Sequence, residues 1–362
     1  MMSILGTGVV FARGRGPAAL EKSLREGWAP PAWEEIAMLP DRRIPLYLVP
    51  PDALGDRALP SQMRRADRFC RMAVATAQEA AGDRLAVVSD RSRIGIVLAT
   101  AWGPHVTTFR FLDDILDYGD AGGSPTTFSH SVHNAVASYI AAVMNIRGPA
   151  VTLTGFSFPF HQALILAEAW LAERRCDCVL AGAVEEIGPT LKYILARELT
   201  LAPDGKIRPF AFQPKPDAVP GEGSVFFLLG PAGSGNDAGA CRITAAPGAA
   251  DASSESGRPD VQLVEADGLA RDESAYPAAV PAGIPAAAYA PLWGSMTIGS
   301  AFHCAAGALM IRDRTIYPFP VPDNPSGIAL AAPGNNAALR RLSSLRCDGR
   351  GATARIWMER GT

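Results

Sequence analysis

The sequence predicts an α/β fold, because strand-like and helix-like stretches alternate along it. The clearest unit covers residues 151–184: a strand that ends at Thr154, a bend at Gly155, a helical pattern over 162–174 and a buried strand over 176–184. In the helical part, apolar residues recur every three or four positions, which is typical of an amphipathic helix. At 362 residues, the chain is long enough to bury a large core.

A glycine-rich stretch at 233–239 predicts a flexible joint between two halves of the chain. We therefore place an N-terminal half at residues 1–232 and a C-terminal half at 241–362. The second half has strand and helix patterns of its own and closes with a strand at 354–358. Residues 245–259 are small and polar, which predicts a loop.

Ser157 lies where the strand ending at Thr154 gives way to the helix. A side chain at such an elbow points out of closely packed backbone into a pocket, beside the first helical amides and the positive end of the helix dipole. The position suits a nucleophile, so Ser157 is the first candidate catalytic residue.

Composition and charge exclude several classes of protein. The formal net charge is only -2, so nothing attracts nucleic acid to the chain as a whole. The six cysteines are scattered without C-x-x-C spacing, and no histidine pair has metal-ligand spacing, so we expect reduced thiols, no metal and no cofactor. Without a basic, apolar leader or an apolar run of about twenty residues, we expect a cytoplasmic protein with no membrane insertion.

The unit around Ser157 resembles the β-ketoacyl synthases of the thiolase superfamily. Those enzymes carry a strand, Thr-Ala-Cys-Ser-Ser, a helix and then Asp-x-x-x-x-Ala-Gly-Gly-x-Glu. Here Asp177, Ala181-Gly-Ala183 and Glu185 match the end of that pattern. Counting back without a gap places Ser157 at the position of the family's catalytic cysteine.

Further segments match the family in the same order along nearly the whole chain. They are the opening strand at 4–10, the first helix at 19–27, a buried strand at 93–100, the segment 124–134, Ile207-Arg-Pro-Phe210 and Pro220-Gly-Glu-Gly-Ser224. The resemblance implies a thiolase-like five-layer αβαβα fold with two similar halves, each with a mixed β-sheet.

The catalytic residues of the family are missing. The family carries one histidine in Glu-Ala-His-Gly-Thr and a second in Gly-His-x-x-Gly-Ala. This chain reads Val264-Glu-Ala-Asp-Gly-Leu269, so Asp267 replaces the first histidine, and Gly294 aligns with the second to within about two residues. The family's C-terminal Gly-Phe-Gly-Gly is altered as well, to Cys347-Asp-Gly-Arg-Gly-Ala352.

These changes predict that the chain does not condense acyl groups by itself. A serine hydroxyl needs an adjacent base, usually histidine, whereas cysteine reacts as an accessible thiolate. Loss of one oxyanion donor costs about a hundred- to a thousandfold in rate, and loss of general acid–base help costs a similar factor. Asp267, if anionic, would repel a developing oxyanion; if buried and protonated, it would donate a hydrogen bond instead.

Three phenylalanines surround Ser157, where the family has small residues. Phe156, Phe158 and Phe160 either fill a core that no longer holds substrate, or form a wall that limits an acyl chain bound to a neighbouring subunit. His161 follows Ser157 by four residues, so a Ser–His contact is a further alternative. His303, in an apolar helix, is the candidate for the missing histidine if the alignment has slipped.

A synthase-like chain without its triad resembles the chain-length factors of type II polyketide systems and the synthase-like subunits of aryl-polyene pathways. The resemblance implies a non-condensing subunit that pairs with an active ketosynthase and shapes its acyl tunnel, with acyl carrier protein as a further partner. The arginine cluster Arg57, Arg64, Arg65, Arg68 and Arg71 is either a solvated face or the carrier contact. The alternatives are a Ser157-dependent acyltransferase, hydrolase or decarboxylase, and a carrier-binding homodimer without catalysis.

Overall fold

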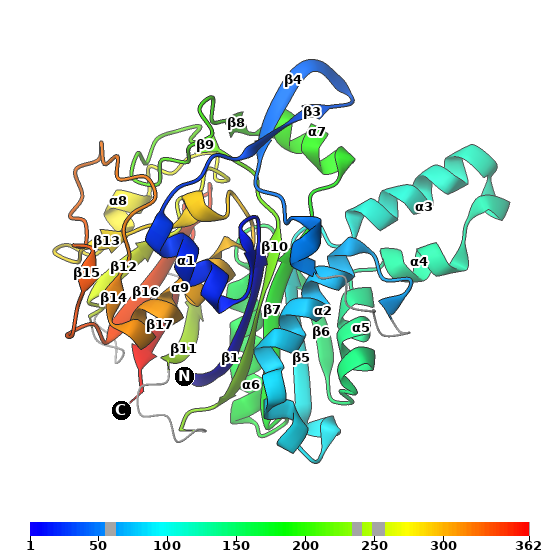
Figure 1. The fold of residues 1–362 in the computed structure, drawn as a ribbon, viewed down its shortest axis with the longest axis horizontal. Helices are drawn as coiled ribbons and strands as arrows, with labels where there is room; N and C mark the ends of the chain where they lie inside the picture. The colour runs from blue at the N-terminus through cyan, green and yellow to red at the C-terminus, as the bar shows by residue number, and fades with distance from the viewer. Residues whose placement is uncertain (55–62, 234–240, 248–257, 362) are drawn as a thin grey trace.

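The computed structural model describes residues 1–54, 63–233, 241–247 and 258–361 (Figure 1). Most of the described strands form one large sheet, which contains two sets of strands with the same order and directions. The N-terminal set is β1 (Met2–Phe11), β10 (Gly223–Pro231), β7 (Cys178–Glu185), β5 (Ile94–Thr100) and β6 (Ala150–Thr154). The C-terminal set is β11 (Cys241–Pro247), β17 (Thr353–Arg360), β16 (Arg341–Cys347), β12 (Val261–Val264) and β13 (Ala286–Ala287).

In each set, the first two pairings between neighbouring strands are antiparallel and the last two are parallel. The two sets meet where Met2 and Ser3 of β1 pair with Ile243 and Arg242 of β11. This repeat of order and direction confirms the predicted fold class, with two similar halves that each contain a mixed sheet.

Helices cover both outer faces and fill the space between the two sets of strands. On the outer face of the N-terminal set lie α2 (Arg68–Ala81) and α5 (Ala135–Met144). Helix α2 approaches β1 closely because Gly6 and Gly8 carry no side chain: a Cβ at either would lie 2.0 Å from a backbone oxygen of α2. The outer face of the C-terminal set packs against α8 (Tyr276–Ala279) and residues 210–212.

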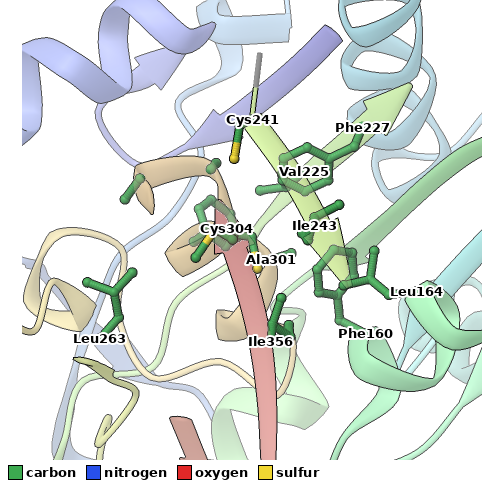
Figure 2. Close-up of a cluster of buried hydrophobic side chains, with 14 of the residues drawn as sticks. Phe160, Leu164, Val225, Phe227, Cys241, Ile243, Leu263, Ala301, Cys304 and Ile356 are labelled. Carbon is green, nitrogen blue, oxygen red and sulfur yellow. The ribbon is translucent and has the colours of Figure 1, made fainter. Parts of the chain in front are cut away.

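The central layer contains α6 (Pro159–Ala172) and α9 (Gly299–Asp313), together with α1 (Pro17–Glu26). Figure 2 shows Phe160 and Leu164 of α6 with Val225 and Phe227 of β10 and Ile243 of β11 in one apolar cluster. Burial of this cluster joins the halves, because apolar surface removed from water contributes about 25 cal/mol per Å².

Two parts project from this body in Figure 1. One is an arm made of α3 (His105–Tyr118) and α4 (Pro125–Ser131), which follow β5. The other is the hairpin of β3 (Ala32–Ile36) and β4 (Leu39–Leu46), which packs against α7 (Pro189–Glu198). The arm carries exposed apolar side chains on both of its helices: Phe109, Leu112, Leu116, Tyr118 and Phe128.

Most predicted elements appear within a few residues of their expected limits, with one clear correction. The predicted loop at 245–259 is wrong at its start, because Ala245–Pro247 continue β11 in register with Ala354–Ile356 of β17. Residues 248–257 and 234–240 lie outside the described residues, so the predicted joint and the exact limits of the two halves stay predictions.

Candidate functional site

Ser157 occupies the turn between β6 and α6, as the elbow prediction requires. Strand β6 ends at Thr154, and α6 begins at Pro159. The Ser157 hydroxyl is half-buried and donates a hydrogen bond of 3.3 Å from Oγ to Oδ2 of Asp348. It lies on the wall of a cavity of about 530 Å³, which Phe156, Ala270, Arg271, Arg346 and Arg350 also line.

Asp348 is the partner that the sequence did not reveal. It follows β16, in the turn that leads to β17. Its Oδ1 accepts hydrogen bonds from the backbone amides of Arg350 at 3.0 Å and Ala352 at 2.8 Å, so the carboxylate is fixed by its own turn. The altered glycine motif at 347–352 marked this turn as unusual, but only the fold brings its carboxylate to Ser157.

Two electrostatic effects act in opposite directions on Ser157. The start of α6 favours negative charge by about 0.3–1 kcal/mol, although Pro159 at its first turn has no amide hydrogen to donate. The Asp348 carboxylate disfavours negative charge, and two like charges at about 4 Å repel by roughly 1 kcal/mol in water and 4 kcal/mol near a protein surface. Of these two effects, the repulsion by the carboxylate in contact with Ser157 is the larger.

Asp267, which the sequence predicts at the position of the family's first histidine, is held in a buried ion pair. Its Oδ2 lies 3.4 Å from the guanidinium of Arg346, and its two oxygens accept the amides of Leu269 and Met296, each at 3.1 Å. Burial raises the pKa of Asp267, although Arg346 and these amides favour the charged form. Both carboxylate oxygens of Asp267 already accept hydrogen bonds from within the chain, so the side chain has little capacity left to bind a substrate.

Arg346 connects Asp267 to a second buried carboxylate. Its guanidinium lies 3.6 Å from Glu265, whose oxygens also accept hydrogen bonds from the hydroxyls of Ser300 and Ser344. The sequence did not indicate these partners, because Arg346 and Glu265 lie 81 positions apart. Arg346 is in β16, and Glu265 directly follows β12. The pairing follows from the parallel register of these two strands.

The histidine candidates do not contact Ser157. Both ring nitrogens of buried His161 lack a hydrogen-bond partner among the described residues, and burial lowers its pKa to about 4. Nδ1 of His303 donates a hydrogen bond of 3.1 Å to the Gly299 carbonyl oxygen, and burial lowers the pKa of His303 as well. The alternative of a Ser157–His161 pair is therefore wrong in this structure.

Gly294, which the sequence predicts near the position of the second histidine, has no room for a side chain. Its φ is 99°, which favours glycine, and a Cβ there would lie 2.8 Å from the Val219 carbonyl oxygen and 3.0 Å from Gly221. The backbone of this segment is packed directly against residues 219–221, so a histidine at position 294 would require the chain to move.

The three phenylalanines lie in three different environments. Phe156 is 61% exposed, lines the Ser157 cavity and packs edge-to-face on Trp102 at 5.0 Å between ring centroids. Phe158 contacts the ring of His161. Phe160 points into the core against Phe227 (Figure 2), so its assignment to the substrate pocket is corrected: it begins the amphipathic face of α6.

A second cavity, of about 410 Å³, adjoins the first. The two share Leu269, Ala270 and Arg271, and the second is also lined by Arg197, Lys215 and Glu198. In the predicted arginine cluster, by contrast, Arg68 pairs with Glu222 and Arg71 bonds to the Ala66 carbonyl, while Arg57 lies outside the described residues.

Comparison with known proteins decides the family. The family described as "Beta-ketoacyl synthase, N-terminal domain" matches residues 2–232, more than half of the chain. The chain belongs to the β-ketoacyl synthase family. No curated protein sequence matches it significantly.

Solved ketosynthases share the fold over the full length of the chain. A β-ketoacyl synthase from Burkholderia phymatum is 16% identical, with a TM-score of 0.81 over 100% of this chain and 99% of that one. The ishigamide ketosynthase/chain length factor is 17% identical, with a TM-score of 0.78 over 99% and 98%. A ketosynthase in complex with its chain length factor from Xenorhabdus doucetiae is 15% identical, with a TM-score of 0.76 over 99% and 98%.

Two further observations concern the described part of the chain. No helix within it is long and apolar enough to cross a membrane. All six cysteines are buried and unpaired, as the scattered spacing predicted.

Proposed function

We propose that this chain is a non-condensing ketosynthase-like subunit, which pairs with an active ketosynthase in the cytoplasm and shapes its acyl tunnel in polyketide or fatty acid biosynthesis of the polyene type. The observation that carries the proposal is the hydrogen bond from Ser157 to Asp348. The residue at the nucleophile position faces a carboxylate instead of an imidazole, and a weak base of this kind does not activate a serine hydroxyl at neutral pH.

The other two catalytic positions support the same proposal. Asp267 is held by Arg346 and two backbone amides, and Gly294 is packed against backbone. Neither position offers a neutral donor for the enolate that forms when a malonyl group loses CO2. We therefore expect purified protein, free of any synthase, to form no ketoacyl product detectable by mass spectrometry.

The surface for a partner is the free edge of the sheet together with the arm. Strand β6 is the last strand of its set, so one edge of its backbone has no neighbouring strand among the described residues. Within the same part of the chain, the hydroxyl of Thr152 on this strand is buried without a hydrogen-bond partner. Nearby, Phe128, Val132, Tyr139 and Ala142 line an apolar cavity of about 480 Å³ beside α4 and α5. A second thiolase-like subunit would cover these features together.

Pairing is tested by size-exclusion chromatography with light scattering, alone and with the ketosynthase encoded next to this chain. We expect a 1:1 complex. The double substitution Leu116→Glu and Phe128→Glu should weaken it by at least about tenfold, because each side chain is exposed and apolar. Met38→Glu on the β3–β4 hairpin is the matched control, since Met38 is also exposed. A monomer that pairs with no ketosynthase of its pathway would refute the proposal.

Tunnel shaping is assigned to Phe156, because it is the phenylalanine that borders the Ser157 cavity. In the reconstituted pair, Phe156→Ala should lengthen the product or broaden its length distribution, as read by mass spectrometry. Trp33→Ala, another exposed aromatic residue, should leave the product unchanged. An unchanged product in the Phe156 variant would remove the tunnel role but would leave pairing intact.

The second cavity supports a carrier contact better than the arginine cluster does. Arg197 and Lys215 line it beside the Arg271–Glu198 pair, whereas Arg68 and Arg71 are used inside the chain. Acidic carrier proteins dock on basic surfaces, so we expect Lys215→Glu to weaken carrier binding more than Arg64→Glu does.

The alternative of a Ser157-dependent acyltransferase, hydrolase or decarboxylase has one observation in its favour. Ser157 lies on a cavity of about 530 Å³, large enough for part of an acyl thioester. Intact mass after incubation with acyl-carrier decides between the two functions. We expect no adduct; an adduct mapped to Ser157 and absent from Ser157→Ala would establish the alternative.

A further inference from the structure

We propose that Asp348 is a positioning residue that keeps residue 157 out of nucleophilic chemistry. Its carboxylate holds the Ser157 hydroxyl as a hydrogen-bond donor and opposes any negative charge at that side chain. The proposal goes beyond the partner-subunit function and does not depend on it, because the contact lies within a single chain.

The Asp348 carboxylate is held in place by its own turn, independently of Ser157. The amides of Arg350 and Ala352 bind its Oδ1, which leaves Oδ2 directed at the Ser157 hydroxyl. The turn itself is packed against the next loop, since a Cβ on Gly349 would lie 3.0 Å from the Arg271 amide nitrogen. Asp348 therefore presents a fixed charge and cannot swing away without breaking its own turn.

Three cations line the cavity, and two of them are paired with other carboxylates. Arg346 pairs with Asp267 and Glu265, and Arg271 pairs with Glu198 at 3.3 Å. Arg350 shares the turn with Asp348 and lines the same cavity. From α6, the helix start favours an anion weakly, and His161 is neutral at neutral pH because burial lowers its pKa to about 4. The group in direct contact with Ser157 is the carboxylate.

A serine fits this environment and a cysteine does not. The hydroxyl stays protonated at any physiological pH and makes a good donor to a carboxylate. A thiol is a weaker donor, and its reactive thiolate would form beside a like charge, which raises the pKa of an acid. Restoring cysteine at position 157 alone would therefore leave the site unreactive as long as Asp348 remains.

The test compares S157C, S157C with D348N, and S157C with D177N. Asp348→Asn keeps an oxygen for the turn amides but removes the charge. Asp177→Asn removes an equally negative group that lies before β7, at the opposite edge of the sheet from the ends of β6 and β7. Each lone chain is alkylated with iodoacetamide between pH 6 and 10, and peptide mass spectrometry follows position 157 separately from the buried native cysteines.

In S157C, we expect half-maximal alkylation above the ordinary thiol pKa of about 8.5. D348N should lower this midpoint by about one unit and raise the rate at pH 7.5 about tenfold, whereas D177N should change neither. An equal or slower rate in D348N would overturn the proposal. The thermal unfolding of S157A, D348N and the double variant gives a second readout: the two changes should be coupled, and strict additivity would also refute the contact. Neither readout uses a partner, so failure here and failure of pairing are distinguishable.

Discussion

Substitution of Asp267 by alanine tests whether this residue has become structural. The change leaves the amides of Leu269 and Met296 without their acceptor and leaves Arg346 buried with Glu265 as its remaining carboxylate partner. If Asp267 instead worked on a substrate, its removal would cost activity and little stability.

The expected cost follows from the burial of the whole group. Removing one partner of a buried ion pair costs about 3–5 kcal/mol, and an orphaned buried amide costs about 1–3 kcal/mol. These penalties overlap, so we expect a total of about 3–5 kcal/mol. Unfolding entropy of about 2.1 cal/mol/K per residue gives roughly 0.8 kcal/mol per degree for a chain of 362 residues. Asp267→Ala should therefore lower Tm by about 4–6 °C.

Asp260 supplies the matched control for this experiment. Its Oδ2 also accepts two backbone amides, those of Arg340 at 2.8 Å and Arg341 at 2.9 Å, but the side chain is exposed. Asp260→Ala should cost only about 1 kcal/mol. Asp267→His, which restores the family residue, should destabilise as Asp267→Ala does and should restore no condensation. Differential scanning fluorimetry that finds equal losses at positions 267 and 260 would refute the reasoning.

Three further predictions concern protonation and backbone. Burial raises the pKa of Glu273 from 4.5 to about 8, so the folded state holds an extra proton between these pH values and stability is lost as pH rises through this range. Glu273→Gln should therefore be nearly neutral below pH 4.5 and increasingly stabilising from there to pH 8, as shown by Tm against pH. The pKa of His161 is lowered from 6.5 to about 4, so stability falls as pH drops through this range, and His161→Leu should flatten that part of the profile in urea unfolding. Gly294→Ala should cost about 2 kcal/mol or more, and clearly more than Gly327→Ala, whose φ is also positive but whose Cβ would meet nothing within 4 Å.

The sequence predicted the fold well because its signals are local and repeated. Apolar periodicity and glycine bends place β6, α6 and β7 to within a few residues, and the same order of elements recurs in the second half. The exception at Ala245–Pro247 has a clear cause: small residues carry little strand signal, and pairing with β17 decides their conformation.

From the sequence, only the replacement of the family's catalytic residues could be predicted, and not the contacts of the residues that replace them. The sequence identified Ser157, Asp267 and Gly294 as replacements, but their new partners are far away in the chain. Asp348 reaches Ser157 across 191 positions, and Arg346 reaches Asp267 across 79. The first contact arises when the two halves pack together and the second from the pairing of β12 with β16, and no spacing or periodicity in one sequence reports either.

These partners bear on why the protein persists without its catalytic residues. If the former active site had simply been released from selection, we would expect buried charges without partners and empty space at the three positions. Instead Ser157 is bonded to Asp348, Asp267 is bonded to Arg346 and two amides, and Gly294 fits closely against Val219 and Gly221. Buried ion pairs rarely add stability over apolar packing, but losing one partner is costly. These contacts favour the proposal that the region now has a structural role. Under the proposed function, a part in another subunit's reaction, through the edge of β6 and the apolar arm, requires these positions to stay packed but requires no turnover here.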